Sequence, residues 1–231
     1  NSEQTQEKTF LRKELFGRGS IQGRGRLAET LRGTSLYKGA RTIYVSPAVL
    51  LGQVRINVLA DGKNLLVPAP GLKDGYYLLR GSRVPAGKLA FAATPAGMAE
   101  FGQRLDVDFR EGFSADLLVN EVLAVDQRGN HLGDGHGFFD LVIAILAAAG
   151  GLSADWKAVA VPLAGMIQIE DLPVDPWDVP VHAALASDRL HFFEPRPASP
   201  TIMWEALSRK KIRKISPLWK LFRRMEEDSS S

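Results

Sequence analysis

A glycine-rich loop ahead of a helix pattern is the part of this sequence whose residues best suit chemistry on an anion. Its glycines occupy every second position, namely Gly133, Gly135 and Gly137. An apolar, strand-like run, residues 115–125, precedes the loop, and an apolar helix pattern follows it. A strand, a glycine loop and a helix in this order direct backbone N–H groups toward an anion at the N-terminus of the helix. The alternative interpretation is a plain turn, because a glycine triplet by itself is a weak motif.

Two cations near the beginning of the sequence have a spacing that suits the same task. Lys8 and Arg12 are four residues apart in a helix pattern over residues 5–16. Residues at that spacing share one face of a helix, so both side chains can point at one place. The segment Gly17–Gly25, rich in glycine and arginine, follows this helix. We interpret it as a connector, with an anion-facing lid as the alternative.

Other polar residues admit two roles each. Gln53 and Arg55 could bind a carboxylate or phosphate of a substrate, although an exposed helix arginine is ordinarily only solvated. Asp140 lies in the first turn of a predicted helix, where an acid interacts favourably with the helix dipole. We expect His131 and His136 to cap the loop or to face a phosphate, because no third metal ligand is evident.

The composition excludes several classes of site. The chain has 231 residues, of which 45% are hydrophobic and 24% charged, as is ordinary for a globular protein. It contains no cysteine, which excludes disulfides, thiolate metal sites and cysteine nucleophiles. The longest apolar run, Leu141–Ala149, is much shorter than the roughly 20 residues that cross a bilayer. The first ten residues contain no apolar leader, so we expect a cytoplasmic protein without a transmembrane segment.

Positive charge is concentrated near the end of the sequence. Residues 209–224 contain eight Lys or Arg and no acid, whereas the whole chain has a net charge of only +3. The rest of the chain is therefore slightly acidic, and we do not expect a nucleic-acid partner for the domain. Apolar residues alternate with these cations, so the segment could lie on an anionic membrane or RNA, or pack its apolar side on the domain. We favour packing on the domain.

The elements that must position these residues alternate between strands and helices. Predicted strands are 41–46, 64–68, 76–79, 115–125, 157–163 and one strand within 183–193. Predicted helices are 5–16, 27–31, 48–59, 139–149, 201–207 and 217–225, with a loop and a short helix in 85–102 and a loop in 171–180. Largely apolar strands alternating with helices predict a three-layer α/β domain whose mostly parallel sheet is covered on both faces. We expect this domain in residues 1–200, followed by a helical basic arm in 201–231 that packs on it and has a disordered end. We expect Trp177 and Trp204 to be packing anchors.

Three segments together resemble one protein family. Residues 126–140, DQRGNHLGDGHGFFD, are similar to the pattern D-x-x-G-x-R-L-G-x-G-x-G-Y-Y-D of the 5-formyltetrahydrofolate cyclo-ligases, also called methenyltetrahydrofolate synthetases. Lys8–Arg12 resembles that family's early K-x-x-L-R element, and Leu172–Val181 resembles its late element with a central aspartate. Ile202–Leu207, followed by Ile215–Pro217, resembles a divergent branch with an extended C-terminus.

The resemblance implies a reaction and a set of site residues. In this family ATP activates the formyl oxygen of 5-formyltetrahydrofolate as a phosphate ester, and ring closure gives 5,10-methenyltetrahydrofolate, ADP and phosphate. The resemblance implies that Lys8 and Arg12 contact the ATP phosphates. It also implies that the loop from His131 to Phe139, including His136 and Phe138, surrounds them, and that Asp140 and Asp178 hold Mg²⁺. Without the resemblance, Asp178 would be interpreted as a turn residue. The substrate is then a folate-like small molecule, and no residue is assigned to the chemical step.

Three departures from the family pattern support an alternative function. The family's arginine before L-G is His131, and its Y-Y-D-R is Phe138, Phe139, Asp140 and Leu141. Its E-x-x-T element after the first strand has no counterpart, since Leu51–Asn57 occupies that place. The alternative is a catalytically degenerate cyclo-ligase-like domain that binds a nucleotide or a protein partner.

Overall fold

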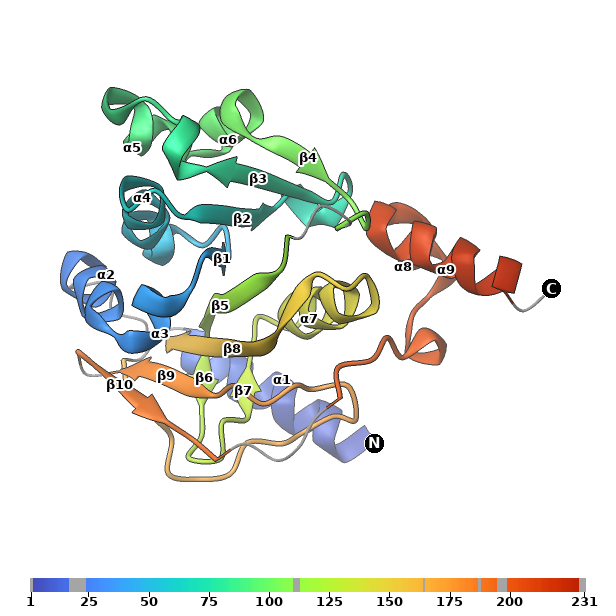
Figure 1. The fold of residues 1–231 in the computed structure, drawn as a ribbon. Coiled ribbons are helices and arrows are strands. Elements are labelled where there is room, and N and C mark those ends of the chain that lie inside the picture. Colours follow the sequence, from blue (N-terminus) through green and yellow to red (C-terminus); the bar gives the residue numbers. More distant parts are fainter. Residues whose placement is uncertain are drawn as a thin grey trace.

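A mixed sheet forms the centre of the computed structural model, which describes residues 2–16, 24–109, 113–163, 165–186, 188–194 and 199–228 (Figure 1). Within that part of the chain its strands run in the order β10-β9-β8-β5-β1-β2-β3-β4. Their bounds are β1 Thr42–Val45, β2 Asn64–Pro68, β3 Tyr76–Arg80, β4 Gln103–Leu105, β5 Ala115–Val122, β8 Leu152–Pro162, β9 Ala183–Ala186 and β10 Arg189–Phe192. The five strands from β9 to β2 are parallel to one another, and β3, β4 and β10 add antiparallel edges.

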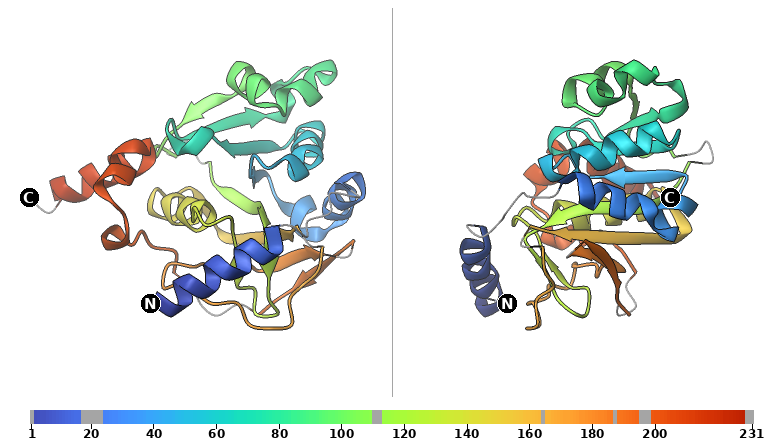
Figure 2. Two further views of the ribbon diagram at one scale, coloured as in Figure 1. Left: turned by 180° about the vertical axis from the view of Figure 1, so that it is seen from behind. Right: turned by 90° about the vertical axis from the view of Figure 1, so that its left-hand side faces the viewer.

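Helices cover both faces of this sheet (Figure 1). The first face carries α2 Arg24–Gly33, α3 Ser35–Gly39, α4 Gly52–Ala60, α5 Leu89–Ala92 and α6 Pro95–Phe101, and the second carries α7 Phe138–Ala148, α8 Arg209–Lys214 and α9 Ser216–Asp228. Short 3-10 turns are η1 Val49–Leu51, η2 Pro70–Leu72, η3 Gly81–Arg83, η4 Ala86–Lys88 and η5 Trp204–Ala206. Figure 2 shows that α1 Ser2–Phe16 lies apart from both layers. The predicted three-layer α/β architecture with a mostly parallel sheet is therefore confirmed.

Alternation along the strands produces two separate cores. In β1, Ile43 and Val45 face the core beneath α2 and α4, whereas Tyr44 faces the core beneath α7. Successive side chains of a strand point to opposite faces, so apolar residues at every position imply a sheet that is buried on both sides. The last two helices, α8 and α9, share the second core through Ile212, Ile215 and Leu218.

Several element boundaries differ from the predictions. The predicted strand 115–125 ends at Val122, because Ala124–Val125 (β6) pairs with His131–Leu132 (β7) in a separate hairpin. The predicted strand within 183–193 is two antiparallel strands, β9 and β10, and Asp188 directly before β10 has a φ of 59°. Residues 201–207 form only the 3-10 turn η5. Most of the glycine- and arginine-rich segment after α1, and the end of the arm, lie outside the described residues.

No helix in the described part of the chain is both long and apolar enough to cross a membrane. The prediction of Trp204 as a packing anchor agrees with its contact with Phe222, whose ring centroid is 5.5 Å away. The same prediction for Trp177 is wrong, because Trp177 is 43% exposed.

We predict that His182 makes the fold sensitive to acid. Its Nδ1 accepts a hydrogen bond from the Ala158 N–H (3.1 Å), and burial together with Lys157 lowers the pKa of His182 to about 4. A histidine whose pKa is lower in the folded state favours folding above its unfolded pKa of about 6.5, and that contribution is lost as the pH falls toward 4. Since the ring is partly exposed, we expect a loss of about 1–2 kcal/mol.

The measurement is the free energy of unfolding in urea at pH values between 8 and 4. His182→Asn keeps an acceptor near the Ala158 N–H but has no charged form, so its stability should vary less with pH over this interval. His136→Asn, which removes an exposed histidine, is the matched control. Equal slopes for the wild type and His182→Asn would contradict the prediction.

Candidate active site

A cavity in the described part of the chain opens at the carboxyl ends of the parallel strands. It has a volume of about 790 Å³ and is lined by the ends of β1, β2, β5 and β8 together with α1 and the glycine loop. The connection after β1, containing α4, packs on the first face of the sheet, whereas α7, after β5, packs on the second. Adjacent strands whose connections leave in opposite directions create a crevice at their carboxyl ends, and ligands of α/β proteins bind in such crevices.

Predicted residues that are far apart in the sequence line this one cavity. They are Lys8, Arg12, Arg55, His131, Gly133, Gly135, Gly137, Phe138, Phe139, Asp140 and Asp178. Two predicted residues do not line it. His136 is in the loop but outside the lining, and the Gln53 amide donates to Asn57 Oδ1 (2.9 Å) on α4. The structure therefore assembles most of the predicted set in one place, and the roles of its members remain predictions.

A buried carboxylate holds the segment that leads into the glycine loop. Asp126 is 0% exposed and accepts four hydrogen bonds. Three come from the turn that follows it, namely from the N–H groups of Arg128 and Asn130 and from the Asn130 side chain (each 2.9 Å). The fourth comes from the Leu172 N–H (2.9 Å), on the loop that also carries Asp178. Asp126 thus fixes two site-forming loops relative to each other.

The glycine loop has the backbone that its sequence requires. Gly135 and Gly137 have φ angles of +97° and +61°, which side chains larger than hydrogen rarely adopt. A Cβ on Gly135 would lie 3.3 Å from Arg12 Nε, whereas a Cβ on Gly133 or Gly137 would meet nothing within 4 Å. Arg12 Nε also donates to the Gly133 carbonyl (3.1 Å). The cavity side of this loop therefore has room for a group that touches its backbone beside a guanidinium, as a phosphate would.

Lys8 lies in a carboxylate cluster. It is 4% exposed, and its Nζ is 2.6 Å from a carboxylate oxygen of both Asp175 and Asp178. The Asp175 N–H also donates to Asp178 (2.8 Å). Burial raises the pKa of Asp178, while the Lys8 ammonium and this N–H act in the opposite direction, and the net shift is upward. An ammonium has three donors, so Lys8 retains one N–H beyond these two contacts.

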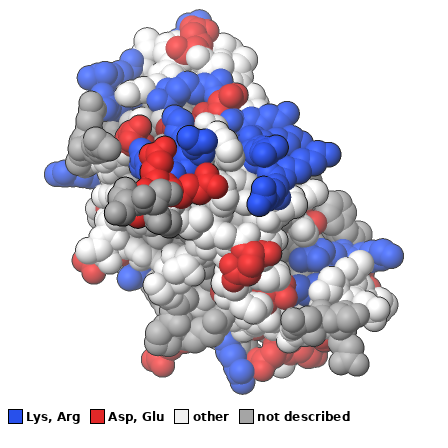
Figure 3. Space-filling model, turned by 90° about the vertical axis from the view of Figure 1, so that its right-hand side faces the viewer, with Lys and Arg blue, Asp and Glu red and all other residues white. Residues whose placement is uncertain are grey.

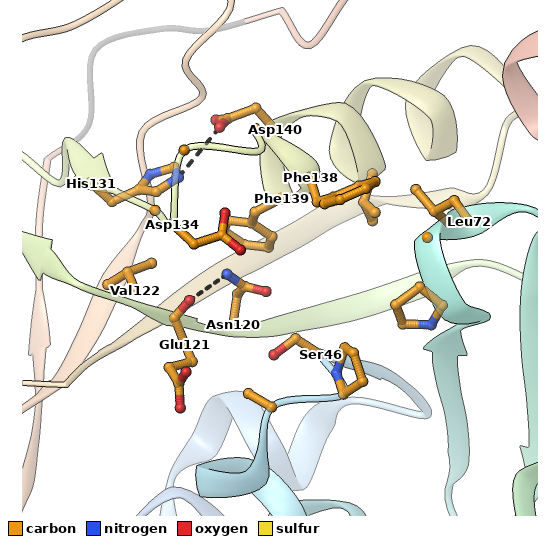
Figure 4. A pocket seen from close by; sticks show the side chains of 18 of the residues that line it. Ser46, Leu72, Asn120, Glu121, Val122, His131, Asp134, Phe138, Phe139 and Asp140 are labelled. Atoms are coloured by element: carbon orange, nitrogen blue, oxygen red, sulfur yellow. Dashed lines mark hydrogen bonds and ion pairs between the residues drawn. The ribbon is translucent and has the colours of Figure 1, made fainter. Parts of the chain in front are cut away.

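His131 and Asp140 form a second charged pair beside this cluster (Figure 4). His131 Nε2 is 3.6 Å from Asp140 Oδ2, and Asp140 Oδ1 accepts from the Val179 N–H (2.9 Å). Burial lowers the pKa of His131, but the Asp140 charge outweighs it and the pKa lies above its usual value. Burial likewise raises the pKa of Asp140, and His131 with the Val179 N–H outweighs it, so that this pKa is lowered.

The two predicted metal ligands fit a magnesium site poorly in this arrangement. Asp178 is bound to Lys8, and Asp140 is held by His131 and a backbone N–H. Among the described residues, no three His, Cys, Asp or Glu side chains are grouped to hold a metal ion. Mg²⁺ that is bound by one or two carboxylates usually retains several waters and contacts substrate phosphates. These carboxylates would have to exchange a cationic partner for the metal.

Arg55 differs from the expected exposed helix arginine. It is 6% exposed, and its guanidinium donates to the carbonyl oxygens of Ser46 (2.7 Å), Ala48 (3.0 Å) and Ala93 (3.3 Å). Burial lowers its pKa. Its first task is therefore structural, because it fixes the chain that leaves the carboxyl end of β1.

The sequence analysis missed several polar residues on the floor of the cavity. Asn120 and Glu121 lie near the end of β5, opposite Asp134, Phe138 and Phe139, which project from the loop and the start of α7 (Figure 4). The Asn120 side chain donates to the Glu121 carbonyl (2.7 Å). Ser46, directly after β1, has a buried Oγ with no hydrogen-bond partner among the described residues. A signal was present, because Asn120 and Glu121 are adjacent polar residues within a largely apolar strand pattern.

Comparisons with known proteins all point to the same protein family. The chain matches the model of the 5-formyltetrahydrofolate cyclo-ligase family over residues 5–187. It is 29% identical over 221 residues to a methenyltetrahydrofolate synthase domain-containing protein of Bos taurus, covering 91% of this chain and 56% of that protein. The corresponding Danio rerio protein is 25% identical over 220 residues, covering 92% and 55%. This chain thus spans about half the length of the curated relatives it matches.

A solved structure supports the fold. The NMR structure of the Aquifex aeolicus 5,10-methenyltetrahydrofolate synthetase matches with a TM-score of 0.55 and 22% identity, covering 83% of this chain and 95% of that one. At this identity the match bears on the architecture and not on the reaction.

Proposed function

Because this chain belongs to the 5-formyltetrahydrofolate cyclo-ligase family, we propose that it is an ATP- and Mg²⁺-dependent cyclo-ligase acting on 5-formyltetrahydrofolate or a closely related folate. The observation that carries the proposal is the assembly of Lys8, Arg12 and the glycine loop around one cavity. Phosphoryl transfer depends mainly on positioning and on charges placed around the transferring group, and these residues supply both. Mg²⁺ enters the proposal as the counter-ion that arrives with ATP.

Each part of the cavity has a task in this proposal. Arg12, the remaining N–H of Lys8 and the backbone N–H groups of the loop stabilise phosphate charge. The other end, with Ser46, Asn120 and Glu121, holds the substrate through hydrogen bonds. The aromatic rings at the start of α7 narrow the space between the two ends and limit access of water to the activated formyl group.

The direct test is incubation of the purified protein with Mg-ATP and 5-formyltetrahydrofolate. We expect formation of a methenyl product that absorbs in the near ultraviolet, together with an equal amount of ADP. A well-folded sample that yields neither product nor ADP would contradict the proposal.

The arrangement of the carboxylates favours a second candidate function, a nucleotide-binding or interaction module without turnover. Asp178 is paired with Lys8, Asp140 is paired with His131, and the Asp134 carboxylate already accepts the His136 N–H (2.9 Å). Calorimetric titration separates the candidates: the module would bind ATP without forming ADP in the presence of the folate. Turnover by the wild type would exclude it.

Gly135 provides a test of the phosphate end of the cavity. We expect Gly135→Ala to weaken ATP binding about tenfold, because its Cβ would press on the Arg12 side chain at a strained, positive φ. Gly150→Ala is the matched control, since Gly150 has a φ of +69° and open space around its Cβ position. It should share the strain without changing the ATP dissociation constant. Equal ATP affinity of the wild type and Gly135→Ala would place the phosphates elsewhere.

A further inference from the structure

The C-terminal helices lie outside the part of the chain that matches the family, yet they are firmly attached to it. The match ends at residue 187, whereas α8 and α9 span 209–228. Ser216 Oγ and Lys220 Nζ both bind Asp106 (2.5 and 2.7 Å), and Arg224 binds Asp108 (2.8 Å). With their apolar side in the core beneath α7, these helices have a fixed position relative to the glycine loop.

One cation of α8 differs from the others in its surroundings. Arg209, Lys210, Arg213 and Lys214 are exposed, and Lys and Arg side chains gather on this face of the molecule (Figure 3). Lys211 instead faces the glycine loop: its Nζ donates to the His136 carbonyl oxygen (3.2 Å) and lies 5.8 Å from the centroid of the Phe138 ring. Partial burial lowers its pKa.

The contact with His136 fixes the direction of a neighbouring N–H group. The peptide between His136 and Gly137 is trans, so the His136 carbonyl and the Gly137 N–H point in opposite directions. Lys211 holds the carbonyl on the side of the loop that faces α8, and the N–H is therefore directed away from α8. Gly137 lines the cavity and is the N-cap residue of α7, so this N–H belongs to the N-terminal donors that have no partner within the helix.

We propose that Lys211 is a positioning residue of the phosphate site. The C-terminal arm thereby contributes a residue on which the geometry of that site depends. Lys211 sets the orientation of the peptide between His136 and Gly137 and adds positive charge beside a loop that also carries Asp134. It acts through the loop and does not itself line the cavity. This inference rests on the proposed function for its ligand, the phosphates of ATP.

The test compares three variants of α8 by calorimetric titration with Mg-ATP. We expect Lys211→Met to raise the ATP dissociation constant about tenfold, since both a charge and an oriented donor are lost. Lys214→Met removes an exposed cation from the same helix and should change the constant less than about twofold. Lys211→Arg, which can still donate to the carbonyl and lie over the ring, should recover most of the affinity. A purely structural role would lower the melting temperature of Lys211→Met without this pattern.

A second readout needs no nucleotide. In amide NMR of the free protein, we expect the heteronuclear NOE values of residues 133–137 to fall in Lys211→Met and to stay unchanged in Lys214→Met. Unchanged loop order and unchanged ATP affinity in Lys211→Met would overturn the inference. If the wild type bound no ATP, the proposed function would fail, and the NOE comparison alone would decide whether Lys211 positions the loop.

Discussion

Replacing Lys8 by methionine should reduce turnover of 5-formyltetrahydrofolate at least about 100-fold, because it removes the most buried cation of the site. Methionine has a similar length but no charge, so Asp175 and Asp178 would face each other without the ammonium that now lies 2.6 Å from both. The variant should lose ATP affinity as well as turnover. The measurements are the rate of product formation and the ATP dissociation constant.

Two controls separate loss of charge from loss of helix α1. Lys13→Met removes an exposed cation from the same helix and should keep turnover within about twofold of the wild type. If repulsion between the carboxylates detaches α1 in Lys8→Met, limited proteolysis will cleave this helix faster. Adding Asp175→Asn should then protect it again without restoring turnover. Turnover by Lys8→Met close to the wild-type rate would remove Lys8 from the site.

Replacing Asp126 by alanine should lower the free energy of unfolding by about 3–5 kcal/mol. Asp126 is fully buried and accepts four hydrogen bonds, so the variant leaves those buried donors unsatisfied. The measurement is urea denaturation monitored by tryptophan fluorescence. Because two of the site-forming loops meet at this carboxylate, the variant should also lose ATP binding at temperatures where it remains folded.

Asp134→Ala is the matched control for Asp126→Ala, since it removes an aspartate from the neighbouring loop. Asp134 is exposed and accepts a hydrogen bond from the His136 N–H, so its loss should cost less than about 1 kcal/mol. If both variants had the same stability, the four contacts of Asp126 would not hold the two loops together.

The centre of the sheet could be predicted from the sequence because its strands are largely apolar, as in Thr42–Val45 and Asn64–Pro68. The strand Asn64–Pro68 was predicted at its observed bounds, and the predicted range of α7, 139–149, differs from the observed one by a single residue. The hairpin of β6 and β7 could not be predicted, because the apolar pattern resumes at residues 122–125 after Asn120 and Glu121 and gives no sign that the chain leaves the sheet at Val122. Asp126 directly follows β6, and its hydrogen bond with the Leu172 N–H of a distant loop forms only in the folded chain.

The site residues could be predicted where the residue type and spacing indicate one role. They could not be predicted where the role depends on contacts that form only in the folded chain. Glycines with positive φ and two cations at helical spacing indicated the loop and α1, and the family resemblance added Asp140 and Asp178. The sequence gives no indication that Lys8 pairs with Asp175, since the two are 167 positions apart. Arg55 was considered as a substrate contact, with an exposed and solvated helix arginine as the alternative, whereas here it is buried and donates to three backbone carbonyls.

The most direct measurement of the central claim is a coupled assay of the wild-type protein and Lys8→Met with Mg-ATP and 5-formyltetrahydrofolate. If the cavity at the strand ends is a cyclo-ligase site, the wild type will form methenyl product and ADP in equal amounts, and Lys8→Met will form at least about 100-fold less of both. Equal rates of product formation by the two proteins, or no product and no ADP from a folded wild type, would contradict the claim.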